Sequence, residues 1–231
     1  MSATPTRSAF VAIAVFVAVS VLHLGALIIG AEQLSSWTKP LLMPTLAIAV
    51  IVVGGLRSGG RGYLLMIALL FSTVGDIALL GEGNTLFLIG LGAFLVAHIV
   101  YIAIFVGPTG RGWPRWWSAI FVVWFGILMA ALVPHLDELL LPVVGYGVVI
   151  ATMAIVSTRC APRVMLGALL FLMSDSILAL NLFVPNLEMW QPDLLIMFTY
   201  LAGQGLIAWG LVVSWRDRAS DLSPTSKVAS R

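Results

Sequence analysis

Two acidic residues lie deep inside segments that are otherwise built for a lipid environment. Asp76 occurs in LLFSTVGDIALL and Asp175 in LLFLMSDSILAL, and each is followed 25 residues later by a tyrosine, Tyr101 and Tyr200. Because a carboxylate in hydrocarbon costs about 2.5–3.5 kcal/mol even on insertion scales, such residues mark a candidate functional site. Two carboxyl groups at one site can exchange protons with a substrate or with water, as general acid–base catalysis requires.

Polar side chains accompany the acids at helical spacing. They are Ser72, Thr73, His98, Asn181 and Gln204. Ser72, for example, precedes Asp76 by one turn and therefore shares its helix face. These groups would leave hydrogen bonds unmade in lipid, so we expect them to line a shared polar cavity. Each of them alone could instead join two neighbouring helices by a hydrogen bond.

The acids are carried by a strongly apolar chain. Of its 231 residues, 61% are hydrophobic and 10% are charged, and its mean hydropathy is +1.08, which is typical of integral membrane proteins and excludes a soluble domain. Eight apolar stretches reach the ~17–25 residues that cross a bilayer core. Their continuous apolar character favours helices over the alternating strands of a barrel. We predict an all-α bundle with spans at residues 8–30, 37–55, 62–80, 86–107, 113–133, 138–157, 162–184 and 192–215.

Charge predicts the orientation of this bundle. Eleven of the 12 Lys and Arg residues fall at the termini or in alternate loops, and Lys39 falls on the opposite side. The positive-inside rule therefore places both the N and C termini in the cytoplasm. The Ser-rich tail, residues 216–231, is expected to be disordered there. The first apolar segment is longer than a signal-peptide core, so we expect it to be retained as a membrane-spanning helix. The composition favours a bacterial inner membrane.

A common offset of 99 residues relates the two acids and the two tyrosines. It predicts an internal repeat within a single membrane domain, residues 1–231, with four-helix units at 8–107 and 113–215. An even number of spans per unit makes the repeats parallel, about an axis along the membrane normal. With a rise of ~1.5 Å per residue, Asp76, Asp175 and His23 reach a similar level in the outer half of the bilayer. A chance recurrence of the spacing is the alternative.

Several motifs resemble those of one known family. The strings STVGDIALL, GAFLVAHIVYIAIF, FLMSDSILALNLF and YLAGQGLIA, with KP in the second predicted span, resemble the YhhN-like lysoplasmalogenase family of eight-span membrane proteins. The resemblance covers predicted spans two to four and six to eight. It implies hydrolysis of the vinyl ether bond of lysoplasmalogens to a fatty aldehyde and glycerophosphoethanolamine or glycerophosphocholine. The partners would be the lysophospholipid substrate and membrane lipids. We expect no cofactor and no nucleic-acid partner, because the corresponding motifs do not occur.

That reaction suits a pair of carboxyl groups. Protonation of the distal vinyl carbon forms an oxocarbenium ion, to which water adds before the hemiacetal collapses, so the site needs an acid and a nearby anion. Burial and mutual repulsion keep one of two adjacent carboxyls protonated while the other stays ionised. We expect Asp76 and Asp175 to take these two catalytic roles, in an order that the sequence leaves open.

Supporting roles follow from residue type and position. Lys39, at the outer end of the second span, is a candidate contact for a lysolipid phosphate, although a lysine there can simply extend to the interface. Tyr101, Tyr200 and Gln204 are expected to position the acids or water. His98 is expected to orient the acid of the third span by donating a hydrogen bond.

Three other classes of protein fit parts of the pattern. An intramembrane aspartyl protease also uses two buried acids, but Thr73 stands where its GxGD signature requires glycine. A zinc hydrolase would draw its ligands from His23, His98 and the two acids, yet no HxxxH or HExxH pair occurs, so we expect no metal. A proton-coupled transporter is the main alternative, because buried acids in a repeat fold are what such carriers use.

Overall fold

Long apolar sequence folds as helices here because a helix satisfies its own backbone hydrogen bonds without water. The computed structural model describes residues 7–221, and in this part of the chain eight helices are long and apolar enough to cross a membrane. They are α1 Arg7–Ile28, α2 Glu32–Val52, α3 Gly60–Ala78, α4 Asn84–Ile104, α5 Ile120–Leu132, α6 Leu140–Ser157, α7 Pro162–Phe183 and α8 Pro192–Asp221. Short 3-10 turns, Trp116–Ala119 and Val133–His135, extend α5 at both ends. The predicted all-α membrane fold with eight spans is confirmed.

The start of α2 differs from its predicted limit. The helix begins at Glu32, five residues earlier than expected. The chain turns sharply at Gly30, whose φ of 69° suits glycine, and the next helix can therefore begin at once. The carboxylate of Glu32 also lies in the first turn, where the helix dipole favours an anion.

The end of α8 also differs, because the helix runs to Asp221 and so enters the tail that we expected to be disordered from residue 216. Trp215 Nε1 donates a hydrogen bond to Thr109 Oγ1 at 3.1 Å, and the Arg218 guanidinium donates to the Thr109 carbonyl. Thr109 ends the π-turn that follows α4, so these bonds fasten the last turns of α8 to the rest of the bundle. The remainder of the predicted tail, residues 222–231, lies outside the described residues.

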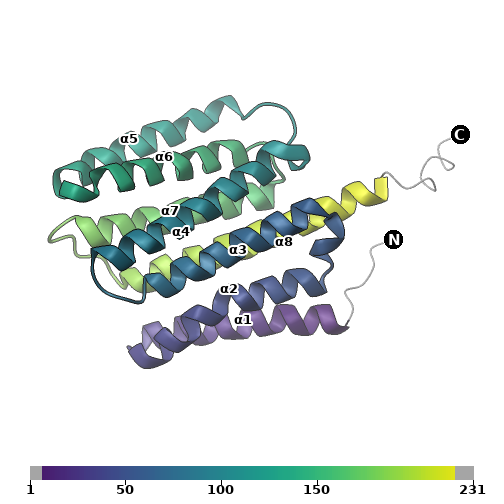
Figure 1. Cartoon of the computed structure of the whole chain (residues 1–231), viewed down its shortest axis with the longest axis horizontal. Coiled ribbons are helices and arrows are strands. Elements are labelled where there is room, and N and C mark those ends of the chain that lie inside the picture. The colour runs from purple at the N-terminus through teal and green to yellow at the C-terminus, as the bar shows by residue number, and fades with distance from the viewer. Residues whose placement is uncertain (1–6, 222–231) are drawn as a thin grey trace, which may run out of the picture.

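Neighbouring helices approach closely where glycines face each other. Figure 1 shows α1 and α2 along one side of the bundle, α5 and α6 along the other, and the remaining four helices between them. A Cβ atom at Gly167 of α7 would lie 2.7 Å from the carbonyl oxygen of Gly203 of α8, so these backbones touch as small residues allow in membrane helices. About two turns further along, Ser174 Oγ donates to the Ile196 carbonyl at 3.0 Å. Helices α7 and α8 therefore form a closely packed pair, and this pair carries polar residues of both helices.

An even number of spans returns the chain to the end of the bundle where it began. Figure 1 shows the start of α1 and the end of α8 at the same end of the bundle. The opposite end collects the ends of the odd-numbered helices and the starts of the even-numbered ones. Both acids lie toward that opposite end. The cytoplasmic location of the termini and the two parallel repeats stay predictions.

Candidate active site

A polar cavity of ≈ 610 Å³ lies at the end of the bundle where α1 and α3 end and α2 and α8 begin. Both acids, Asp76 and Asp175, line it. Lys39 of α2, Asn181 of α7 and Tyr200 of α8 line the same cavity. The structure therefore brings five of the residues singled out in the sequence around one cavity, and they come from four different helices.

Asp76 lies in the last turn of α3, where 3% of the residue is exposed. The Tyr200 hydroxyl donates a hydrogen bond to Asp76 Oδ2 at 2.8 Å. One turn earlier on α3, Ser72 Oγ accepts from Gln204 Nε2 at 3.0 Å, and Gln204 Oε1 accepts from the Tyr101 hydroxyl at 2.5 Å. These three supporting residues are completely buried. Their hydrogen bonds tie α3, α4 and α8 together beneath the first acid.

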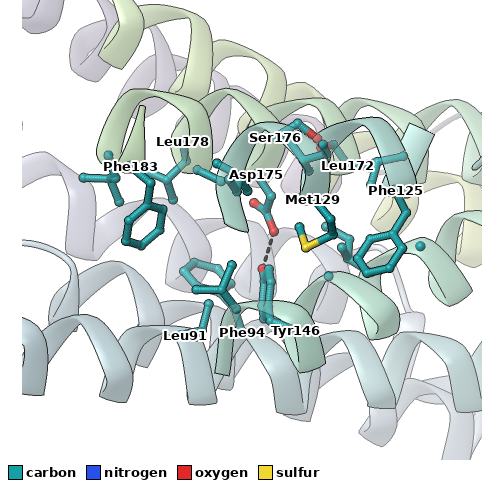
Figure 2. A pocket seen from close by; sticks show the side chains of 18 of the residues that line it. Leu91, Phe94, Phe125, Met129, Tyr146, Leu172, Asp175, Ser176, Leu178 and Phe183 are labelled. Carbon is teal, nitrogen blue, oxygen red and sulfur yellow. Dashed lines mark hydrogen bonds between the residues drawn. The ribbon is translucent and has the colours of Figure 1, made fainter. Parts of the chain in front are cut away.

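Asp175 has a different set of neighbours, and 14% of its side chain is exposed. The Tyr146 hydroxyl of α6 donates a hydrogen bond to Asp175 Oδ2 (Figure 2). His98 Nε2 of α4 lies 4.0 Å from the same oxygen, which is beyond hydrogen-bond distance. The His98 ring stands edge-on to the rings of Tyr146 and Phe171, with centroids 5.4 and 4.6 Å away. The second acid is thus hydrogen-bonded from α6, with the His98 ring of α4 beside it, whereas the first is hydrogen-bonded from α8.

Of the two tyrosines that we expected to position the acids or water, one contacts an acid and the other does not. Tyr200 contacts Asp76, which belongs to the other half of the chain, and Tyr101 contacts Gln204. Depth explains the difference. Tyr101 lies 17 residues into α4 and Tyr200 lies 8 residues into α8, so at ~1.5 Å per residue Tyr200 is the one nearer the level of the acids.

Two further expectations about single side chains are corrected by the structure. We expected His98 to orient Asp76, but its ring lies beside Asp175 because that face of α4 packs toward α6 and α7. Thr73 was expected at the cavity, but its hydroxyl donates to the Leu69 carbonyl of its own helix at 2.8 Å. Asn181, by contrast, does line the cavity.

Tyr146 is a residue of the site that the sequence reasoning missed. It lies in the second turn of α6, close to the end of the bundle that carries both acids. A tyrosine at that depth in an apolar span was the signal that could have identified it.

His23 of α1, which the sequence analysis placed at the level of the acids without a role in the proposed reaction, is 1% exposed and part of the cavity wall. The Thr38 hydroxyl donates to the Leu34 carbonyl at 2.8 Å, so its oxygen accepts from the N–H at His23 Nδ1, also at 2.8 Å. In the tautomer that this arrangement favours, with the proton on Nδ1, Nε2 is a hydrogen-bond acceptor. Among the described residues Nε2 has no partner. The depth of His23 in its span was the signal that could have assigned it to the site.

An apolar hollow of ≈ 60 Å³ adjoins the polar cavity between α4, α5, α6 and α7. Figure 2 shows its wall, with Phe94 and Leu91 on one side and Phe125 and Met129 on another. Asp175 lines this hollow as well as the polar cavity. The second acid therefore stands where an apolar space and a polar space meet.

The rim of the polar cavity carries charges of both signs. Lys39 contributes a cation, and Glu82 and Asp193 contribute carboxylates. Within residues 7–221, no three His, Cys, Asp or Glu side chains are grouped closely enough to hold a metal ion. The arrangement can therefore offer a phosphate, an ammonium group and a reacting centre separate contacts in one cavity.

Comparison with known proteins identifies related sequences. The profile of the YhhN family matches residues 34–211. Human lysoplasmalogenase TMEM86B is 33% identical over 180 residues, covering 76% of this chain and 76% of the human protein. The mouse protein of the same name is 31% identical, covering 74% of each chain, and bovine lysoplasmalogenase TMEM86A is 30% identical, covering 69% of this chain and 72% of its own. No solved structure gave a significant match.

Proposed function

Because this chain belongs to the YhhN family, we propose that it is a membrane hydrolase that cleaves the vinyl ether bond of lysoplasmalogens. The products would be a fatty aldehyde and glycerophosphoethanolamine or glycerophosphocholine. The observation that carries the proposal is that Asp76 and Asp175 line one cavity from different helices. The distribution of Lys and Arg predicts that the cavity lies on the non-cytoplasmic side, and the composition favours a bacterial inner membrane.

The two carboxyl groups divide the chemistry between them. One donates a proton to the vinyl carbon distal to the ether oxygen, and the electron pair of the double bond forms the new C–H bond. The other, ionised carboxyl stabilises the oxocarbenium ion and takes a proton from the water that adds to it. The hemiacetal then transfers its hydroxyl proton to the glycerol oxygen as the C–O bond breaks. One water is consumed for each aldehyde released, and the proton gained by the second carboxyl must return to the first to restore the starting state.

The other residues of the cavity bind and orient the substrate. Tyr200 and Tyr146 each fix one oxygen of a carboxyl group, so the remaining oxygen faces the reacting atoms in a defined direction. Lys39 is placed to contact the phosphate, and Glu82 and Asp193 on the rim suit the ammonium group of ethanolamine or choline. Mixed charge at the mouth favours a zwitterionic headgroup.

The direct test is aldehyde release from a defined lysoplasmalogen by the purified protein in detergent, with a chelator present. Asp76→Asn and Asp175→Asn should each lower kcat by at least about a hundredfold, because each removes a proton donor or acceptor. Asp217→Asn, near the opposite end of α8, is the matched control and should retain activity. Full activity in either active-site variant would contradict the two-aspartate mechanism.

The same assay on the purified protein distinguishes hydrolysis from proton-coupled transport. The names of the relatives favour hydrolysis. An enzyme releases aldehyde in detergent, whereas a carrier needs sealed vesicles. If the intact protein releases no aldehyde from any lysoplasmalogen, transport becomes the better explanation of the buried acids.

A further inference from the structure

We propose that the narrow apolar hollow binds the aliphatic chain of the lysolipid, and that Asp175, where this hollow meets the polar cavity, is the acid that protonates the vinyl ether. This assignment rests on the proposed function and deepens it, because it orders the roles of the two acids. Asp76, which lines the polar cavity, is then the carboxylate that receives the proton from water.

The two spaces differ in the way the two halves of a lysolipid differ. The polar cavity measures ≈ 610 Å³ and carries Lys39 and both acids. The hollow measures ≈ 60 Å³, about a tenth as much, and rings and aliphatic groups make up most of its wall (Figure 2). A narrow apolar space suits a thin hydrocarbon chain, and a wide polar one suits a hydrated zwitterionic headgroup.

The hollow also reaches the surface that faces lipid. Leu182 of α7 and Trp124 of α5 both line it, and they are 51% and 44% exposed. Exposed apolar side chains at the edge of an apolar space let a chain pass from the bilayer without crossing water. Trp124 Nε1 is meanwhile satisfied by Ser176 Oγ at 3.2 Å, so its polar edge does not oppose such passage.

The geometry of the substrate links chain position to acid identity. In a vinyl ether written R–CH=CH–O–R′, the carbon that receives the proton is the one that carries the chain R. Water adds to the other carbon, next to the ether oxygen and on the headgroup side. A chain held in the hollow therefore places the proton-accepting carbon at Asp175 and the water-accepting carbon toward the polar cavity.

The hydrogen bonds of the two acids agree with this order. Tyr146 occupies Asp175 Oδ2, so a proton carried by this carboxyl sits on Oδ1 and is available to the substrate. Asp76 accepts a hydrogen bond from Tyr200 and, unlike Asp175, does not line the apolar hollow, which suits the ionised partner. Water in that cavity reaches Asp76 without passing the chain.

The chain site is tested by the dependence of turnover on chain length. Ala151 lies on the α6 wall of the hollow and is 7% exposed, so Ala151→Leu should lower kcat/KM for a hexadecenyl substrate relative to an octenyl one by about tenfold. Met129→Ala, on the α5 wall, should shift the preference the opposite way. Ala130→Leu, exposed on the same helix, is the control and should leave the profile unchanged.

Saturated 1-O-alkyl lysolipids, which lack the double bond, provide a readout that needs no turnover. Their inhibition or binding constants should follow the same chain-length shifts in the two variants. Aldehyde release with an unchanged profile in both variants would overturn the chain site and leave the proposed function standing. Failure of the unaltered protein to release aldehyde would overturn the proposed function, and the binding series would then judge the hollow by itself.

The order of the acids is tested by solvent isotope effects. Proton transfer to carbon by Asp175 should give the unaltered enzyme a normal effect in heavy water. Asp76→Asn should reduce that effect toward unity, because addition of water to the cation then becomes rate-limiting. The residual turnover of Asp175→Asn should keep the full effect, and the reverse pattern would show that the two roles are exchanged.

Discussion

The hydroxyl of Tyr200 offers a sharp test of the site, because a single atom can be removed from it. Tyr200→Phe deletes the donor that lies 2.8 Å from Asp76 Oδ2, while the ring keeps its edge contacts to Phe94 and Phe171 at 5.9 and 5.3 Å. The variant should therefore fold normally. Any loss of activity then reports the hydrogen bond rather than the packing of α8.

The size of the effect follows from the environment of that bond. A hydrogen bond to a charged group is worth about 1.5–3 kcal/mol, which corresponds to roughly a 10- to 150-fold change in rate. Asp76 also faces the polar cavity, where water can replace part of the lost donor. We therefore expect kcat/KM to fall by about tenfold, near the lower limit.

The assay is aldehyde release at equal amounts of folded protein, with thermal stability measured in parallel. Tyr63→Phe is the matched control, since Tyr63 is 60% exposed near the other end of α3. A Tyr200→Phe enzyme within twofold of the unaltered one would refute the idea that this hydroxyl stabilises a working carboxylate. A large fall in thermal stability would instead assign Tyr200 to the structure of the bundle.

Three further predictions concern the rim of the polar cavity, the packing of two helices and a cysteine in a loop. Lys39→Gln should raise KM about tenfold with little change in kcat, because a phosphate contact acts equally in the ground and transition states; steady-state kinetics decide this. Gly167→Val should lower Tm, since its Cβ would lie 2.7 Å from a backbone oxygen of α8 and overpacking costs about 1–3 kcal/mol, whereas Gly145→Val, with open space around its Cβ, should not. Burial raises the pKa of the Cys160 thiol to about 11 from about 9. Since the thiolate is the reactive form, alkylation at neutral pH should be about a hundredfold slower than for an ordinary cysteine and should speed up as the pH rises toward 11.

The spans and the acids could be predicted from the sequence because the physics that fixes them is local. Hydropathy over about 20 residues decides whether a helix crosses a membrane, and a carboxyl group inside such a helix needs polar company. Counting residues from the ends of the spans was enough to put Asp76 and Asp175 at one level. Both conclusions depend on rise per residue and on burial, which need no knowledge of neighbouring helices.

The partners of the acids could not be predicted, because they depend on how each helix is rotated and which helices touch. The sequence suggested that both tyrosines position the acids or water, but only the packing of α4 and α8 determines that Tyr200 contacts Asp76 and that Tyr101 contacts Gln204. His98 illustrates the same limit, since the face of α4 that carries it turns toward Asp175. Spacing along one chain does not encode the rotation of one helix against another.

The apolar hollow and the polar cavity meet at Asp175, and this arrangement has a consequence for the fate of the products. In the proposed binding mode, the aldehyde keeps the aliphatic chain after cleavage and the glycerophosphodiester keeps the charged headgroup, so each product would remain in the space that suits it. The aldehyde can leave past the exposed edge near Leu182 directly into the bilayer, and the water-soluble product can leave through the cavity beside Lys39. Separate exits would keep the two products from recombining and from blocking each other's release, and would deliver a reactive aldehyde to the membrane rather than to the surrounding water.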